Sequence, residues 1–308
     1  MSTRASRTDS GSTDADSRAL ARIAVGVDGY PEGRDAAVLG ATIARATGAE
    51  LMLVAIHPDP LVVVPRELGW TEMQKQAEAM LRETRDAVAP DARIDVETDW
   101  SVPRALERVV RREHRDLLVV GSSRRGSAGR VRIGKRTRQL LGHGKCALAV
   151  APRGLRNITG RRLGRVGVGY EDGPESRAAL SLAGSIAVAA GAKLLVRGVV
   201  DDRLPAVGWS ASSRERRLAM WDELLQPAVE SLRENAEGAA KATGADAEVE
   251  VLRGSPADAL GELCEHVDLL VIGSRRWGAA ARALLGSTGE TLMHDASCPI
   301  LVVPHSDA

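Results

Sequence analysis

The sequence contains no phenylalanine, and aromatic residues make up only 2% of its 308 positions. Proteins that stack nucleic-acid bases on aromatic side chains are therefore nearly excluded, and hydrophobic cores must be built from aliphatic residues. The chain has only three cysteines, Cys146, Cys264 and Cys298. Three cysteines are too few for a disulfide framework in a chain of this length, so we expect a reducing, cytoplasmic location.

The sequence also lacks an excess of charge and any long apolar run. It carries 42 basic and 41 acidic residues, which argues against a dedicated binder of nucleic acid or another polyanion. No segment approaches the roughly 20 apolar residues of a membrane-spanning helix. Residues 1–18 are polar throughout and lack the apolar stretch of a signal peptide, so we expect a disordered tail there and no membrane partner.

The chain does contain an internal duplication. Residues 22–57 align without a gap with residues 165–200, and residues 116–152 align in the same way with residues 268–304. In the second alignment DLLVVGSSRRG becomes DLLVIGSRRWG. The duplication predicts two domains of ordinary size. The expected units are the tail at 1–18, a first domain at 19–153, a basic linker at 154–163 and a second domain at 164–308.

Strand and helix patterns alternate within each copy. Short apolar, β-branched runs at 22–27 and 165–170 are typical of buried parallel strands, and a Pro-Glu turn follows each of them. Helices are expected at 34–47, 73–88, 106–112, 177–190, 218–240 and 260–265, with Gly48 and Gly191 as C-caps. This alternation predicts an α/β protein of two tandem, doubly wound, Rossmann-like domains, each with a five-stranded parallel sheet.

Candidate binding residues follow from this fold, because ligands of doubly wound sheets bind beyond the carboxyl ends of the strands. The residues at these ends are Asp28 and Glu171 after the first strand, Ile56 and Val199 after the second, and Gly121 and Gly273 after the fourth. Gly134 and Gly286 each precede the next helix, and Ser287 and Thr288 add hydroxyl groups in the second copy. Glycine lets backbone amides approach a phosphate closely, and a helix N-terminus favours an anion.

With these residues the sequence resembles the universal stress protein family, as a tandem two-domain member of the kind common in actinobacteria. Family members that bind ATP carry an aspartate after the first strand. After the fourth strand they carry glycine, two residues, glycine, nine residues, and glycine followed by serine or threonine. The first copy matches this pattern at Asp28, Gly121 and Gly134, but Arg124 replaces the middle glycine and Lys135 replaces the hydroxyl residue.

The second copy departs from the pattern at different positions. It matches at Gly273, Gly286 and Ser287, but Arg276 replaces the middle glycine and Glu171 replaces the aspartate. The first copy therefore keeps the ribose end of the pattern, and the second copy keeps the phosphate end.

The resemblance implies roles for these residues and a ligand, ATP, and it leaves open whether Mg²⁺ accompanies the nucleotide. Ile56 and Val199 would offer backbone atoms to adenine, Asp28 or Glu171 would accept hydrogen bonds from ribose, and the glycine loops would hold phosphates. The resemblance also implies that the last strands, 147–151 and 300–303, pair antiparallel. That pairing would join the two domains as a pseudo-dimer within one chain or join two chains in a homo-oligomer.

The arginine substitutions have two interpretations. A non-glycine residue at positive φ costs about 1–2 kcal/mol, and a charged hydrogen bond to phosphate offsets about 1.5–3 kcal/mol. Arg124 and Arg276 therefore indicate either altered phosphate handling or loss of the site. The first copy's loop is also unusually basic. This charge indicates either a solvated surface or a second site for an anion. Its basic residues are Arg124, Arg125, Arg130, Arg132, Lys135, Arg136 and Arg138.

The sequence predicts a stress-response protein that binds an adenine nucleotide in one or both domains and acts by regulation or interaction. It shows no histidine pair with metal spacing, no Cys-x-x-Cys and no nucleophile elbow, so we expect no catalytic residues and no metal site. One alternative is a nucleotide-independent interaction or scaffold protein with degenerate sites. The other is a slow ATPase, for which Asp28, Glu171, Ser287 and Thr288 are the available Mg²⁺ ligands.

Overall fold

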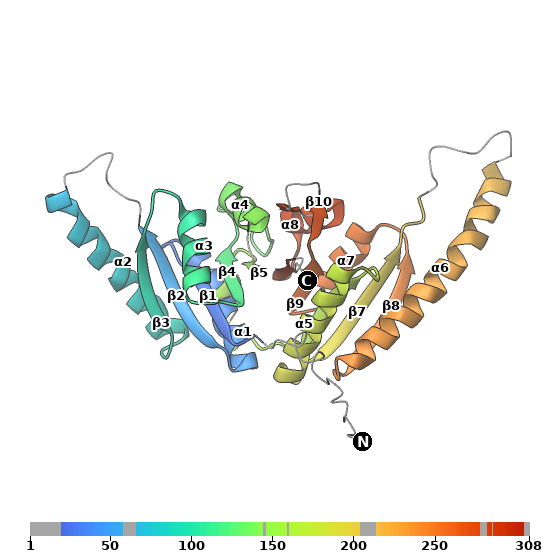
Figure 1. The fold of residues 1–308 in the computed structure, drawn as a ribbon, viewed down its shortest axis with the longest axis horizontal. Coiled ribbons are helices and arrows are strands. Elements are labelled where there is room, and N and C mark those ends of the chain that lie inside the picture. The colour runs from blue at the N-terminus through green and yellow to red at the C-terminus, as the bar shows by residue number, and fades with distance from the viewer. Residues whose placement is uncertain are drawn as a thin grey trace, which may run out of the picture.

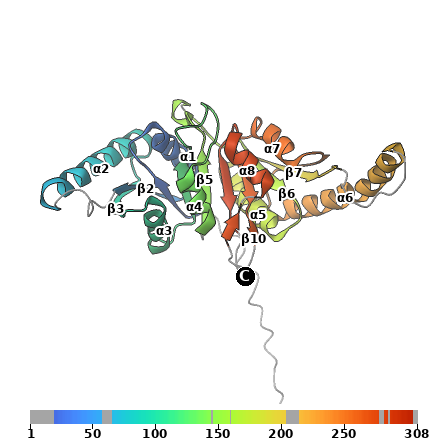
Figure 2. The same cartoon turned by 90° about the horizontal axis from the view of Figure 1, so that it is seen from above.

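The computed structural model describes residues 20–57, 66–143, 146–158, 160–203, 214–277, 282–284 and 286–304. The predicted tail at 1–18 lies outside these residues. Two α/β halves lie side by side, with α2 and α6 at their outer ends (Figures 1 and 2). The first half contains β1 (Arg22–Gly26), α1 (Pro31–Thr47), β2 (Glu50–His57), α2 (Arg66–Val88), β3 (Arg93–Thr98), α3 (Val102–Arg112), β4 (Leu117–Gly121), α4 (Lys135–His143) and β5 (Ala147–Ala151).

The second half repeats this order and adds a hairpin. A 3₁₀ helix, η2 (Leu155–Asn157), lies between the two halves, before the first strand of the second half. Its elements are β6 (Arg165–Tyr170), α5 (Pro174–Ala190), β7 (Lys193–Val200), α6 (Arg214–Ala242), β8 (Ala247–Arg253), α7 (Pro256–Cys264), β9 (Leu269–Gly273), β10 (Arg275–Trp277), β11 (Arg282–Leu284), α8 (Ser287–Asp295) and β12 (Ile300–Val303). The hairpin of β10 and β11 occupies the segment for which the sequence predicted a glycine loop.

The two predicted five-stranded sheets form one sheet of ten strands, in the order β3-β2-β1-β4-β5-β12-β9-β6-β7-β8. Within the ten-stranded sheet, strands of the same half pair in parallel, as predicted, whereas β5 and β12 pair antiparallel with Ala149 opposite Leu301. Both of these side chains are fully buried. The last strands therefore join the two domains within one chain, which is the pseudo-dimer arrangement.

Helices cover both faces of the sheet, and the core is aliphatic on both. Buried residues of α1, α2, α5 and α6 pack on one face, and those of α3, α4, α7 and α8 pack on the other. The second cluster includes Leu148, Val150, Ile300 and Val302 of the two central strands, so one core runs through both domains. Among the described helices, none is long and apolar enough to cross a membrane.

Several helices begin earlier than the sequence predicted, and proline explains the difference. α1 begins at Pro31 instead of 34, α5 at Pro174 instead of 177, and α7 at Pro256 instead of 260. Proline suits the first helical position because its fixed φ is already helical and the amide it lacks would be unpaired there. The predicted C-caps are confirmed, since Gly48 and Gly191 have φ of 72° and 61°.

The start of the predicted linker is anchored on the first domain. Asp35 of α1 is fully buried, and its carboxylate accepts hydrogen bonds from the amides of Gly154 and Arg156, both at 2.8 Å. The Arg156 guanidinium adds two contacts of 3.1 Å to the same carboxylate. A buried charge needs a full set of partners, and this linker supplies them.

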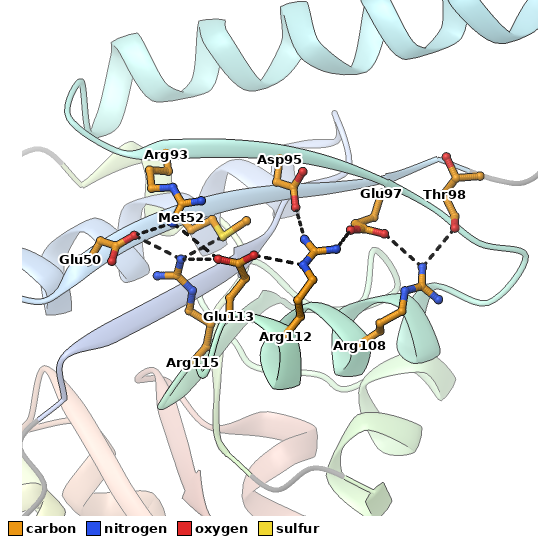
Figure 3. A network of polar contacts seen from close by, with 10 residues as sticks. All are labelled: Glu50, Met52, Arg93, Asp95, Glu97, Thr98, Arg108, Arg112, Glu113 and Arg115. Carbon is orange, nitrogen blue, oxygen red and sulfur yellow. Dashed lines mark hydrogen bonds and ion pairs between the residues drawn. The ribbon is translucent and has the colours of Figure 1, made fainter.

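A ladder of ion pairs fixes α3 to the edge of the sheet in the first domain (Figure 3). Arg108 donates to the carboxylates of Glu97 and Asp99, at 3.1 and 2.7 Å, and to the carbonyl of Thr98. Arg112 contacts Glu97 and also Asp95. α7, the counterpart of α3 in the second domain, carries no arginine, and its residues Pro256, Ala257 and Leu260 line the cavity described next.

Candidate functional site

A cavity of about 500 Å³ opens in the second domain, at the carboxyl ends of β6, β7 and β9. This size lies within the range of small-molecule binding sites, about 300–1,000 Å³. Six of the seven residues that the sequence predicted for this copy line it: Glu171, Val199, Gly273, Gly286, Ser287 and Thr288. Residues from four separate segments of the chain therefore meet at one site.

The turn after β6 that carries Glu171 is held in a strained conformation. Asp172 has a φ of 59°, which is rare outside glycine, and its counterpart in the first domain is Gly29, with a φ of 67°. The Asp172 carboxylate accepts hydrogen bonds from Arg177 at 2.7 Å and from the Tyr170 hydroxyl at 2.8 Å. The hydrogen bond from Arg177, and then that from Tyr170, lower the pKa of Asp172. These contacts offset the backbone strain and fix the position of Glu171.

The N-terminus of α8 forms the opposite wall. Gly286 is its N-cap and offers no side chain to cap the first-turn amides, while Ser287, Thr288 and Gly289 line the cavity. The first four amides of a helix have no partner within the helix, and the helix dipole adds positive potential at the same end. This wall is therefore suited to an anion such as a phosphate.

The glycines after the fourth strands have a packing role that the sequence interpretation missed. An ideal Cβ on Gly121 would lie 2.2 Å from the carbonyl oxygen of Glu32, and one on Gly273 would lie 2.7 Å from that of Glu175. These carbonyls belong to the first turns of α1 and α5, which pack against the strand ends. Glycine is required at both positions whether or not a ligand binds.

Sequence reasoning also missed charged residues on the cavity wall, among them Arg197, Asp201 and Arg203. Arg203 donates from Nε to both carboxylate oxygens of Asp201, at 2.9 and 3.0 Å, and lowers the pKa of Asp201 to about 2. Arg197 donates to the carbonyl of Ala259 at 3.1 Å and contacts Glu250. A signal was available for Arg197, because the aligned residue of the first copy is the apolar Val54.

The equivalent edge of the first domain is built differently. The guanidinium of Arg124 lies over the ring of Tyr30, and the Asp28 carboxylate accepts a hydrogen bond from the Tyr30 amide at 3.3 Å. The pKa of Asp28 is raised, mainly by desolvation and also by the negative charge of Glu32. The hydrogen bond from the Tyr30 amide and the positive charges of Arg124 and Arg136 lower it, but by less. Arg124 and Tyr30 therefore lie at this edge near Asp28, which is itself exposed at the surface.

The other predicted residues of the first domain are more dispersed. Lys135 is exposed at the first position of α4, Ile56 is partly buried at the end of β2, and Gly134 lies beside the side chain of Ser123. Arg276 lies in β10, where it pairs with Ala283, so the position of the middle glycine is a strand in the second domain. The Arg276 side chain lies outside the part of the structure that is described.

The basic loop of the first domain contacts the second domain, which neither sequence interpretation included. The Val131 amide donates to the carbonyl of Ala296 at 2.8 Å, and the Ile133 amide donates to that of Met293 at 3.0 Å. The side chains of Val131 and Ile133 are buried. Two of the loop's cations are used in the same contact, since Arg130 and Arg138 bind residues of α8. Arg130 and Arg138 are therefore interdomain residues.

The fold and the cavity define the class of protein as a tandem, doubly wound α/β protein with a ligand cleft at the carboxyl ends of its strands. The model of the universal stress protein family matches residues 20–152 and 163–304. The chain therefore belongs to the universal stress protein family, with one copy of the family's unit in each half.

Known proteins resemble the chain along most of its length. Universal stress protein Rv2005c of Mycobacterium tuberculosis is 27% identical over 303 residues, which cover 92% of this chain and 97% of that protein. A universal stress protein structure from Archaeoglobus fulgidus covers 93% of this chain, with a TM-score of 0.62 and 17% identity. The structure of a functionally unknown protein from Pseudomonas aeruginosa, PA1789, covers 94%, also with a TM-score of 0.62 and 17% identity. These two structures support the fold.

Proposed function

We propose that this chain is a regulatory protein that binds ATP in the cavity of its second domain. The observation that carries the proposal is the convergence of six residues, predicted from separate loops, on one cavity of about 500 Å³. One wall of that cavity is an uncapped helix N-terminus, which suits the phosphates of a nucleotide.

Each part of the cavity has a role in this proposal. Backbone atoms of Val199 contact adenine, and the Glu171 carboxylate accepts hydrogen bonds from the ribose hydroxyls. The first-turn amides of α8, with Ser287 and Thr288, donate hydrogen bonds to the phosphates. Among the described residues, no three or more histidine, cysteine, aspartate or glutamate side chains come together as a group that could hold a metal ion.

The proposal assigns binding, and not turnover, to this site. The cavity lining does include carboxylates of the kind that serve as general bases, among them Glu171 and Glu175. The alternative, a slow ATPase, is tested by following phosphate release from ATP at saturating concentration. Release that falls on Glu171→Gln, with ATP binding retained, would favour the enzyme.

Isothermal titration of the full chain with ATP tests the proposal, and the duplication offers a matched control. Lys135 and Arg136 occupy the positions of Ser287 and Thr288 in the first domain. We expect Ser287→Ala with Thr288→Ala to weaken ATP binding at least about a hundredfold, since each substitution removes a hydrogen bond to a charged group. We expect Lys135→Ala with Arg136→Ala to leave the affinity within about twofold. Absence of binding at millimolar ATP would contradict the proposal.

A scaffold function is the second candidate, and the first domain favours it. Its basic loop donates main-chain hydrogen bonds to the end of α8, and Arg124 is engaged with Tyr30. We infer that the first domain supports the second domain and does not bind the nucleotide itself. A chain that binds no nucleotide but retains its partners in cells would leave the scaffold function as the account of the whole molecule.

A further inference from the structure

Helix α8 of the second domain is held by the first domain at both of its ends. Its last turn presents carbonyl groups that have no partner within the helix. The Val131 and Ile133 amides of the first domain bind two of these carbonyls, those of Ala296 and Met293. Arg130 Nη1 donates to a third, that of Asp295, at 3.0 Å. The first domain therefore supplies the C-terminal cap of α8.

The first turn of α8 is bound by an ion pair from the same domain. Arg138 Nη1 lies 2.6 and 2.7 Å from the two carboxylate oxygens of Glu290, and its Nη2 lies 3.3 Å from His294 Nε2. Glu290 is the fourth residue of α8, one turn from Ser287 and next to Gly289 and Thr291, which line the cavity. Figure 1 shows α4, which carries Arg138, beside α8.

The ion pair is specific to the pairing of unlike domains. Arg138 and Glu290 are the fourth residues of α4 and α8, so they are the same position of the duplicated unit. Two identical domains paired in this way would place like charges opposite each other, which is unfavourable. In this chain the position carries opposite charges in the two copies, and the carboxylate stands on the helix that faces the cavity.

Glu290 by itself opposes the binding of a phosphate at this wall. A carboxylate in the first turn stabilises the helix but repels a second anion at the same N-terminus. Arg138 neutralises that carboxylate through two charged hydrogen bonds and fixes the first turn of α8 against α4. The positive potential of the helix end then remains available to a ligand.

We propose that Arg138 of the first domain is a positioning residue for the phosphate end of the second domain's site. The proposal rests on the function proposed above and adds that the site is complete only when both domains are paired. A ligand with several phosphates depends on Arg138, whereas a nucleoside without phosphate does not.

The test compares the affinities of ATP and adenosine for the full chain, measured by isothermal titration. We expect Arg138→Gln to weaken ATP binding three- to tenfold and to leave adenosine binding within twofold. Glu290→Gln alone leaves ATP affinity unchanged or raises it. Adding Glu290→Gln to Arg138→Gln restores ATP affinity to within about twofold of the Glu290→Gln value, because the unpaired carboxylate is gone.

Two further variants separate positioning from a loss of stability. Arg138→Lys keeps the positive charge but loses the two-pronged guanidinium group that contacts both carboxylate oxygens. We expect its ATP affinity to lie between those of the unmodified chain and of Arg138→Gln. Arg34→Gln is the matched control, because Arg34 forms a similar exposed ion pair with Glu83 at 3.0 Å, far along the chain from α8. It is expected to change neither affinity.

The outcomes distinguish this inference from the function it rests on. If Arg138→Gln weakens ATP and adenosine equally, or weakens neither, the positioning role is wrong while the nucleotide site stands. If the unmodified chain binds neither ligand, the proposed function is wrong, and the positioning role is overturned with it.

Discussion

The guanidinium carbon of Arg124 lies 4.0 Å from the centre of the Tyr30 ring. Arg124 stands where the family pattern has a glycine, and its contact with Tyr30 lies two residues after Asp28. The counterpart of Asp28 in the second domain, Glu171, lines the cavity. The two copies of the unit have therefore diverged at this edge of the sheet.

This divergence predicts one nucleotide per chain. Glu171→Gln removes a charged acceptor from the cavity and should weaken ATP binding about tenfold, in line with the loss of one charged hydrogen bond. Asp28→Asn, the matched change in the first domain, should leave both affinity and stoichiometry unchanged. Isothermal titration gives both quantities, and a stoichiometry of two per chain would show that the first domain binds as well.

The close approach of Glu32 to Gly121 predicts a large loss of stability for Gly121→Ala. A methyl group at 2.2 Å from a carbonyl oxygen forces the start of α1 away from β4, and we expect a cost of about 2–4 kcal/mol. Gly238→Ala is the control, because Gly238 lies in the C-terminal part of α6 and its Cβ would meet no atom within 4 Å. Removing that helical glycine should stabilise the chain by about 0.5–1 kcal/mol. Urea unfolding measures both, and equal effects would refute the packing role.

The ion-pair ladder of α3 predicts a loss of stability in acid (Figure 3). The hydrogen bond from Arg108 lowers the folded-state pKa of Asp99 below 3.8, with the Ser101 amide assisting. The stabilisation is therefore fully present above pH 3.8 and is lost as the pH falls through the lower folded-state value. Asp99→Asn should cost about 1–3 kcal/mol at pH 7, since it removes charged hydrogen bonds from a side chain that is 4% exposed.

Unfolding curves recorded from pH 7 to pH 2 test this prediction. Below pH 4 the stability of the unmodified chain should fall more steeply than that of the Asp99→Asn variant. Asp91→Asn serves as the control, because Asp91 is exposed and lies two residues before β3. This substitution should leave the curve unchanged. Parallel curves for all three proteins would show that the ladder contributes nothing through Asp99.

The anchor of the linker predicts a further loss of stability. The Asp35 carboxylate accepts hydrogen bonds from the amides of Gly154 and Arg156. Asp35→Asn replaces one carboxylate oxygen with an NH₂ group, which is a donor and cannot accept these bonds. Breaking a buried ion pair on one side leaves unpaired polar groups, and we expect a cost of about 3 kcal/mol. Glu83→Gln removes an exposed ion pair of the neighbouring Arg34 and should cost less than about 0.5 kcal/mol. Thermal unfolding that shifts equally in both variants would contradict the anchor.

The fold could be predicted from the sequence because its signals are local and occur twice. Apolar runs, Pro-Glu turns and the C-caps Gly48 and Gly191 mark strands and helices within a few residues of each other. The residues of the second domain's cavity were predicted for the same reason, since each lies at the end of a strand or at the start of the next helix. The pairing of the last strands followed from the family resemblance.

Contacts between distant segments could not be predicted in this way. Arg130 binds a carbonyl 165 residues away, and nothing around it in the sequence distinguishes it from an exposed arginine. The hairpin of β10 and β11 was missed because the first copy has a loop there, closed by hydrogen bonds such as Ser123 N to Arg132 O at 2.6 Å.

A crystal structure of the full chain grown with ATP would show which domain binds the nucleotide. We expect density for one nucleotide per chain, with its phosphates at the amides of Ser287 and Thr288 and its ribose beside Glu171. We also expect that Arg124 remains over Tyr30 and that no nucleotide lies at Asp28. Nucleotide density at Asp28 alone, or an empty second-domain cavity at saturating ATP, would contradict this account.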